Sequence, residues 1–193
     1  KWFWKTSFSN RYSTGQTTEK MNVDIERISE IRKDDFTEVN KFRYSVTKSE
    51  LIETKFSKAN PLTRALLLLM AQKQPLDLVK NTKIDISQSL SKYNRKQYHH
   101  IFPNAFLKRQ GFPPNKIFSL TNFCFLPAGS NKKISKKSPS DYFFTIIPKD
   151  SFNDILNSNL IPLTKDLYEK DNYNDFLAKR AELIINEVDA VTN

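Results

Sequence analysis

The only two histidines of the chain, His99 and His100, are adjacent, and imidazole is the side chain best suited to proton transfer near neutral pH. Hydrolysis of a phosphodiester needs a base that takes a proton from water and a cation that neutralises the charge growing on the phosphate. A neutral imidazole can be the base, and a second imidazole or an amide oxygen can bind a divalent metal ion. The pair is therefore a candidate hydrolytic site, although adjacent histidines alone are more often structural.

Two asparagines downstream extend this set. A strand is expected at residues 97–102, and successive side chains of a strand point to opposite faces, so one histidine would face a metal ion and the other the attacking water. Asn131, at the start of a predicted helix, is placed to supply another ligand. Asn122 opens a second predicted strand, and it could fix the loop around the base by side-chain to backbone hydrogen bonds.

The positive charge of the chain surrounds the histidines. The chain has 31 Lys+Arg against 21 Asp+Glu, a formal net charge of +10, and residues 86–140 contain basic residues but no acidic ones. A positive patch around titratable groups is typical of a protein that holds a polyanion. Four lysines are expected on one face of a helix over residues 131–137. The predicted phosphate contacts are Arg95, Lys108, Arg109, Lys132, Lys133, Lys136 and Lys137.

These motifs resemble a known family. The string His-His-Ile-Phe-Pro at 99–103, Asn122 before a hydrophobic strand, and Asn-Lys-Lys at 131–133 resemble the His-Asn-His (ββα-metal) nuclease motif. The longer segment 99–142 is similar to the C-terminal nuclease domain of GmrSD-like type IV restriction proteins. Those proteins pair an N-terminal nucleotide-hydrolysing module with this nuclease and attack modified DNA. Residues 2–12 resemble the region that follows the first module.

The resemblance implies a metal-dependent DNA endonuclease or nickase in which His100 is the general base. It implies that His99 and Asn131 bind the metal, that Asn122 supports the active loop, and that water and phosphate oxygens complete the shell. Mg²⁺ or Mn²⁺ is expected first, while nitrogen ligands leave Zn²⁺ or Ni²⁺ open. The implied partners are DNA and the nucleotide-hydrolysing module of the same protein, in a cytoplasmic antiviral restriction system.

Two other functions remain open. A catalytically silent DNA-binding module would keep the basic surface without a metal, and its affinity would fall about 10³-fold between roughly 50 and 200 mM salt for about six phosphate contacts. A toxin-type RNase could use the same chemistry, and a comparison of duplex DNA, single-stranded DNA and RNA would distinguish it. If a histidine is the base, activity is expected to rise through roughly pH 6 to 8 as the imidazole becomes neutral.

The remaining sequence predicts a mainly α fold with a small ββα-metal insert, of α+β class. Met21, Ile25, Ile28 and Ile31 recur at helical spacing, which predicts one buried stripe. The Asn60-Pro61 pair predicts a helix start, followed by a helix that is apolar nearly all round and therefore central. Strands are expected at residues 97–102 and 122–126, and helices at about 17–31, 47–56, 61–72, 105–110, 131–137, 141–144, 150–157 and 173–191.

Composition limits the class of protein further. Three glycines argue against an all-β barrel, and the longest apolar run is far short of the roughly 20 residues of a membrane helix. One cysteine, Cys124, excludes an internal disulfide and a multi-cysteine zinc cluster, and it fits a reducing cytoplasm. We expect residues 1–15 to be a connector from a missing N-terminal module, and 16–193 to be a helical nuclease domain with its ββα core at about 96–138.

Overall fold

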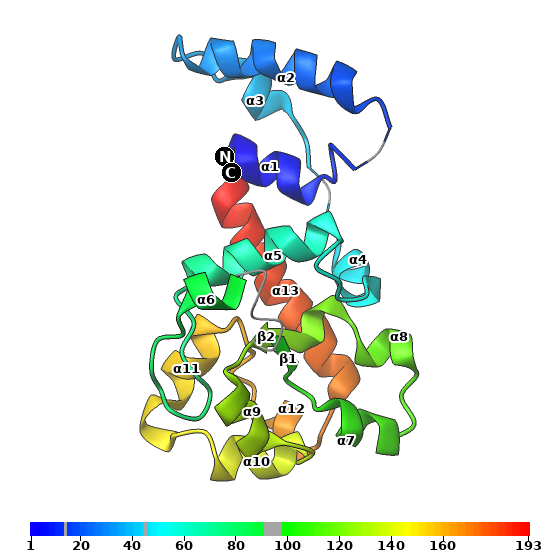
Figure 1. Ribbon diagram of the computed structural model, residues 1–193, viewed down its shortest axis with the longest axis vertical. Helices are drawn as coiled ribbons and strands as arrows, with labels where there is room; N and C mark the ends of the chain where they lie inside the picture. The colour runs from blue at the N-terminus through cyan, green and yellow to red at the C-terminus, as the bar shows by residue number, and fades with distance from the viewer. Residues whose placement is uncertain (14, 45, 91–97) are drawn as a thin grey trace.

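The computed structural model describes residues 1–13, 15–44, 46–90 and 98–193 (Figure 1). This part of the chain is mainly helical with one two-stranded antiparallel sheet, which confirms the predicted mainly α, α+β class, while the ββα-metal identity of the insert stays a prediction. None of its helices has the length and apolar composition needed to cross a bilayer. In chain order the elements are α1 (Trp2–Phe8), α2 (Thr17–Ile31), α3 (Thr37–Lys41), α4 (Lys48–Glu53), α5 (Pro61–Gln72), α6 (Ile86–Leu90), β1 (Tyr98–His100), α7 (Asn104–Arg109), α8 (Pro114–Ile117), η1 (Leu120–Asn122), β2 (Phe123–Phe125), α9 (Ala128–Ile134), α10 (Pro139–Thr145), η2 (Lys149–Ser151), α11 (Phe152–Ser158), α12 (Asp166–Glu169) and α13 (Tyr173–Thr192).

Helices α5 and α13 supply much of the core, and both were predicted correctly. The Asn60 side chain accepts hydrogen bonds from the backbone N–H groups of Leu62 and Thr63, so the predicted cap forms at the start of α5. Helix α13 runs obliquely through the body of the molecule (Figure 1). Its apolar stripe is buried along most of its length, at Phe176, Leu177, Ala181, Ile184 and Val188.

The first residues of the chain form part of this same core. Helix α1 packs against α5 and α13, and its Trp4 and Phe8 side chains are buried in the main hydrophobic cluster. The described part of the predicted connector therefore includes a helix that is integrated into the body. The domain boundary at residue 15 stays a prediction.

Helix α2 has the predicted length, but the prediction that its apolar stripe is buried was wrong. Met21, Ile25 and Ile28 are 48%, 61% and 43% exposed. Asp24 is the one buried residue among the 15 of α2, all of which are described. Helical spacing identifies residues that share a face, but it does not establish that another element covers that face.

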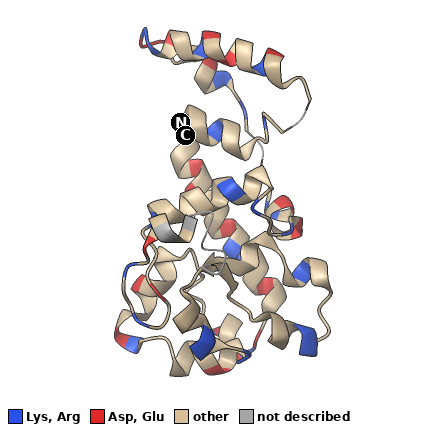
Figure 2. Cartoon of the chain, viewed as in Figure 1, with Lys and Arg blue, Asp and Glu red and all other residues tan. Residues whose placement is uncertain are grey.

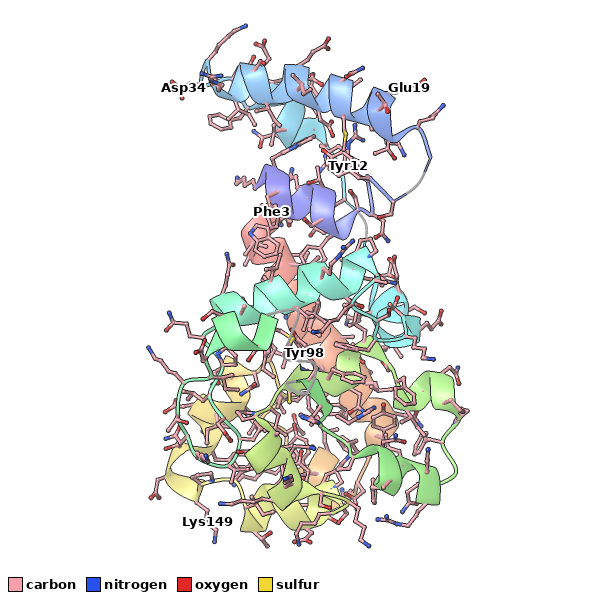
Figure 3. All side chains as sticks on the ribbon, viewed as in Figure 1. Phe3, Tyr12, Glu19, Asp34, Tyr98 and Lys149 are labelled. Atoms are coloured by element: carbon pink, nitrogen blue, oxygen red, sulfur yellow. The ribbon has the colours of Figure 1, made fainter. Side chains whose placement is uncertain are left out.

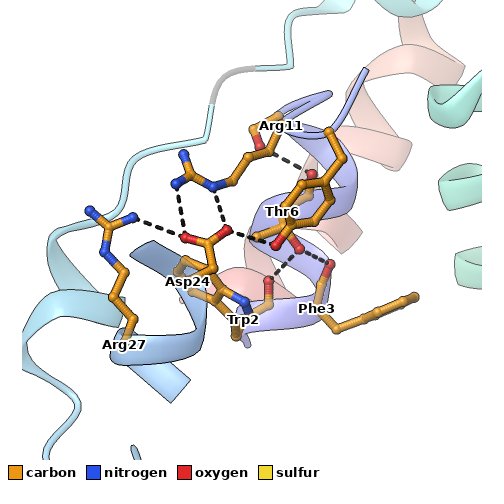
Figure 4. A network of polar contacts seen from close by, with 8 residues as sticks. Trp2, Phe3, Thr6, Arg11, Asp24 and Arg27 are labelled. Atoms are coloured by element: carbon orange, nitrogen blue, oxygen red, sulfur yellow. Dashed lines mark hydrogen bonds and ion pairs between the residues drawn. The ribbon is translucent and has the colours of Figure 1, made fainter. Parts of the chain in front are cut away.

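A polar cluster joins α2 to the end of α1 (Figure 4). The Asp24 carboxylate accepts two hydrogen bonds from Arg11, at 2.6 and 2.8 Å, and one from the Tyr12 hydroxyl at 2.7 Å. Arg27 donates a further hydrogen bond at 3.2 Å. This charge-assisted cluster holds α2 in place where apolar burial does not.

The sheet joins segments separated by α7, α8 and η1. Strands β1 and β2 are antiparallel, with Tyr98 opposite Phe125, His99 opposite Cys124 and His100 opposite Phe123. Both predicted strands are therefore confirmed, although each is shorter than expected. The helix α9 follows β2 directly, which gives a strand, strand, helix order.

The predicted helix over residues 131–137 is displaced toward the N-terminus. Helix α9 begins at Ala128 and ends at Ile134, because Ser135 has a left-handed backbone conformation with φ of 52°. Ser130 lies within the helix, and its hydroxyl donates a hydrogen bond to the Asp77 carboxylate at 2.6 Å. The predicted face of four lysines on one helix is therefore wrong.

The helix predicted at 47–56 ends at Glu53, three residues early, because the next residues pair with another segment. Leu120 N–H donates to the Thr54 carbonyl at 2.7 Å, and Phe56 N–H donates to the Phe118 carbonyl at 2.9 Å. The backbone of residues 54–56 is thus held against the loop that leads into β2.

Candidate functional site

The two histidines lie on opposite faces of the small sheet. Directly opposed residues of an antiparallel pair share a face, so His100 lies with Phe123, and His99 lies with Cys124. The alternation expected from the sequence is therefore present. The two imidazoles have different surroundings and can perform different tasks.

His100 occupies a half-buried aromatic environment. Its ring centroid lies 4.3 Å from that of Phe123 and 5.2 Å from that of Phe118. The Nε2 atom is buried and has no hydrogen-bond partner among the described residues. An unpaired buried polar atom costs about 1–3 kcal/mol, so this nitrogen is a favourable position for a water, substrate or metal ligand.

Burial, and to a smaller extent the neighbouring charge of His99, together lower the pKa of His100 to about 4. The imidazole is consequently neutral throughout the range of roughly pH 6 to 8. With this pKa the deprotonation of His100 is complete below about pH 6, so His100 itself would not cause the rise in activity that the sequence suggested across that range. A neutral imidazole is nevertheless the form that can accept a proton.

The same shift predicts that folding is less stable in mild acid. In an unfolded chain the histidine has its ordinary pKa of 6.5, so between about pH 6.5 and pH 4 the unfolded state takes up a proton that the folded state excludes. Stability should fall as the pH falls through this window, by about 2 to 3 kcal/mol at roughly pH 4.5. Urea unfolding at the two ends of the window would measure this loss in the wild type and in a His100→Phe variant. Equal losses in both proteins would contradict the assignment.

The other face of the sheet leads to α9. Cys124, opposite His99, is fully buried, and burial is the main reason that its thiol pKa is raised to about 12. Of the two smaller effects, the charge of Arg180 lowers this pKa and the charge of Asp77 raises it. Asp77 accepts the hydrogen bond from Ser130 in the first turn of α9. The hydrogen bond between Ser130 and Asp77 fixes the first turn of α9, the helix that carries Asn131. Both predicted metal ligands are half-buried.

Asn122 is fully buried at the entrance to β2. Its Oδ1 atom accepts a hydrogen bond from Phe102 N–H at 2.8 Å, and its Nδ2 donates to the carbonyls of Phe102 and Ile117, each at 3.1 Å. Its own carbonyl accepts from Ile101 N–H at 2.8 Å. One amide side chain thus fixes the segment immediately after His100, by the kind of side-chain to backbone hydrogen bond that the sequence suggested.

Two supporting residues were missed by the sequence analysis. Arg180 is fully buried, and its guanidinium donates to the carbonyls of Thr121 at 2.7 Å, Leu160 at 3.0 Å and Asn159 at 3.2 Å. The Tyr142 hydroxyl donates to the carbonyl of Ile101 at 2.7 Å. An arginine within the apolar stripe of α13 was the available signal, since a charged residue at a buried position needs several partners.

The predicted phosphate-binding residues lie on several elements. Lys108 and Arg109 are exposed on α7, and Lys132 and Lys133 are exposed on α9. Lys and Arg are prominent on α7, α8 and α9 (Figure 2). Arg95 lies outside the described residues.

Lys136 and Lys137 lie beyond the end of α9, beside a surface hollow. Arg109 donates to the Lys136 carbonyl at 3.0 Å, which joins α7 to the segment after α9. Lys137 pairs with Asp141 at 2.9 Å, so an acid just outside the acid-free segment compensates part of its charge. The hollow has a volume of about 490 Å³ and is lined by Phe106, Arg109, Gln110, Lys136, Lys137 and Ser138.

The donor chemistry limits how a metal ion could be held. Within residues 1–13, 15–44, 46–90 and 98–193, no three His, Cys, Asp or Glu side chains come together as a metal-binding group. A site would therefore have to combine His99 with the Asn131 amide and with oxygens of water or phosphate. This mixed set is compatible with divalent ions of first-row and alkaline-earth type.

Comparisons with known proteins give one relative of undetermined function. The chain is 28% identical to the uncharacterized protein MJ0686 of Methanocaldococcus jannaschii, over 97% of this chain and 36% of that protein. It thus spans about a third of the length of that relative. No family model matches the chain, and no solved structure matches it.

Proposed function

We propose that the chain is a metal-dependent DNA endonuclease or nickase of the His-Asn-His class. The observation that carries this proposal is the buried Nε2 of the neutral His100, which has no hydrogen-bond partner in the described part of the chain and lies in a strand, strand, helix unit braced by Asn122. Exposed cations lie on α9 of this unit and on α7, and they favour a polyanionic substrate.

In the proposed mechanism His100 takes a proton from the water that attacks phosphorus in line. Lys132, Lys133 and Arg109 hold flanking phosphates, which positions the backbone without reading its sequence. His99 and Asn131 would hold a divalent ion, with Mg²⁺ or Mn²⁺ expected before Zn²⁺ or Ni²⁺. Such an ion would stabilise the charge on the phosphate and on the leaving 3′ oxygen. One set of these residues makes one site, so each event cuts one strand.

Replacing Asn131 with alanine should weaken metal binding without preventing folding, because the side chain is half-buried on a short helix. We expect the Mn²⁺ concentration for half-maximal nicking to rise at least about tenfold, with recovery of the rate at high Mn²⁺. Asn115→Ala, on exposed α8, is the matched control and should leave the metal dependence unchanged. A variant with wild-type metal dependence would remove Asn131 from the ligand set.

We further propose that this domain is the effector part of a longer cytoplasmic, modification-dependent restriction protein with a nucleotide-hydrolysing module. The support is the motif resemblance together with the length of the relative MJ0686. The region that matches this chain makes up 36% of that protein. Duplex DNA, single-stranded DNA and RNA offered at equal concentration test the substrate class. Preferential cutting of RNA would favour a toxin-type RNase, and salt-sensitive binding without cutting would favour a silent binding module.

A further inference from the structure

Residues 54–58, between α4 and α5, form a second basic edge on the His100 face of the sheet. The backbone pairing of Thr54 with Leu120 and of Phe56 with Phe118 fixes this segment against the loop that leads into β2. It lies outside the acid-free stretch of the sequence, between Glu53 and the start of α5. The fold brings this segment close to His100, and the charge pattern of the sequence does not predict that proximity.

Aromatic contacts continue this connection to His100. The Phe56 ring stacks on Phe123 with a centroid distance of 4.1 Å and lies 5.6 Å from Tyr98. Phe123 in turn contacts the His100 ring at 4.3 Å, and Phe118 contacts it at 5.2 Å. Segment 54–58 and the imidazole are therefore parts of one packed aromatic cluster.

Two exposed lysines lie over the rings of this cluster. The Lys55 Nζ atom lies 5.5 Å from the Phe118 centroid, and the Lys58 Nζ atom lies 4.5 Å from the Tyr98 centroid. Among the described residues neither lysine forms an ion pair, in contrast to Lys137 with Asp141. Cation–π contacts hold an ammonium group near a ring but leave its charge uncompensated.

We propose that Lys55 and Lys58 bind backbone phosphates of the nucleic acid next to the bond that is cut by the water that His100 deprotonates. This inference rests on the proposed nuclease function and adds the surface along which the strand approaches. The contacts of Lys55 with the Phe118 ring and of Lys58 with the Tyr98 ring place two exposed positive charges on the His100 face of the sheet. Both remain exposed, so a phosphate can reach them without displacing packed residues.

The test is the salt dependence of binding to a labelled DNA duplex, measured by fluorescence anisotropy with EDTA present to prevent cutting. The variant Lys55→Gln/Lys58→Gln is compared with Lys149→Gln/Lys165→Gln. The control lysines are also exposed, and Lys149 lies at the lower edge of the molecule, away from the centrally placed Tyr98 (Figure 3). Nicking of plasmid by each protein is measured in parallel with Mn²⁺.

Loss of two phosphate contacts should reduce the slope of log affinity against log salt by about 1.8, and should weaken binding roughly 30-fold at about 0.15 M salt. The control should keep the wild-type slope. If the wild type binds and nicks DNA but the Lys55/Lys58 variant keeps its slope, this surface assignment is overturned while the nuclease proposal stands. If the wild type neither binds nor nicks, the nuclease proposal fails, and this inference fails with it.

Discussion

The His100→Ala variant is expected to nick plasmid DNA about 10²- to 10⁴-fold more slowly than the wild type, which is the usual contribution of a positioned general base. The same variant should bind DNA with nearly unchanged affinity, because the imidazole is neutral and the predicted phosphate contacts come from lysine and arginine side chains. A loss of rate without a loss of affinity would place His100 in the chemical step. Circular dichroism and urea unfolding would verify that the variant is folded.

Exogenous imidazole provides a sharper control for this variant. Removal of the half-buried ring leaves a space bordered by Phe118 and Phe123, and free imidazole could enter that space and accept the proton. We expect partial recovery of nicking at high imidazole concentration in His100→Ala, and no acceleration of the wild type. An alanine variant that cuts at the parental rate would show that His100 is not the base.

The second large effect is expected at Asn122. Asn122→Ala removes three side-chain hydrogen bonds and leaves the buried backbone groups of Phe102 and Ile117 unpaired. Each such group costs about 1–3 kcal/mol, so the free energy of unfolding should fall by about 3 kcal/mol or more. Urea unfolding monitored by circular dichroism would measure the change.

A matched control and a near-isosteric variant make this prediction specific. Asn115→Ala, at an exposed position of α8, should change stability by no more than about 0.5 kcal/mol. Asn122→Asp keeps the acceptor for Phe102 N–H but loses the amide donor for two carbonyls and buries a carboxylate, so it should also be strongly destabilised. A stable Asn122→Ala protein would contradict the bracing role that we assign to this residue.

The helices with clear local signals could be predicted from the sequence. The Asn60-Pro61 cap and the helix at residues 173–191 each depend on neighbouring residues, and both are found as predicted. The stripe of α2 failed because burial depends on a covering element, which local spacing does not supply. Helix α9 ends at Ile134 because of the positive φ of Ser135, and its Ser130 bonds to Asp77, a residue far away in the sequence.

The candidate site was predictable only where its residues form a motif. His99, His100, Asn122 and Asn131 were selected by residue type and order, and the fold places them around one strand, strand, helix unit. Lys55, Lys58 and Arg180 were missed because tertiary packing alone brings them near that unit. The depressed pKa of His100 likewise depends on the aromatic residues that bury it, which come from separate segments.

The most direct test of the central claim is incubation of the purified 193-residue chain with supercoiled plasmid, in Mg²⁺ or Mn²⁺ and in EDTA, beside His100→Ala. The proposed function predicts conversion to nicked circles that requires the metal ion and is lost in the variant. Conversion at the same rate by both proteins, or no conversion in either metal ion by a folded wild-type chain that binds the plasmid, would contradict it.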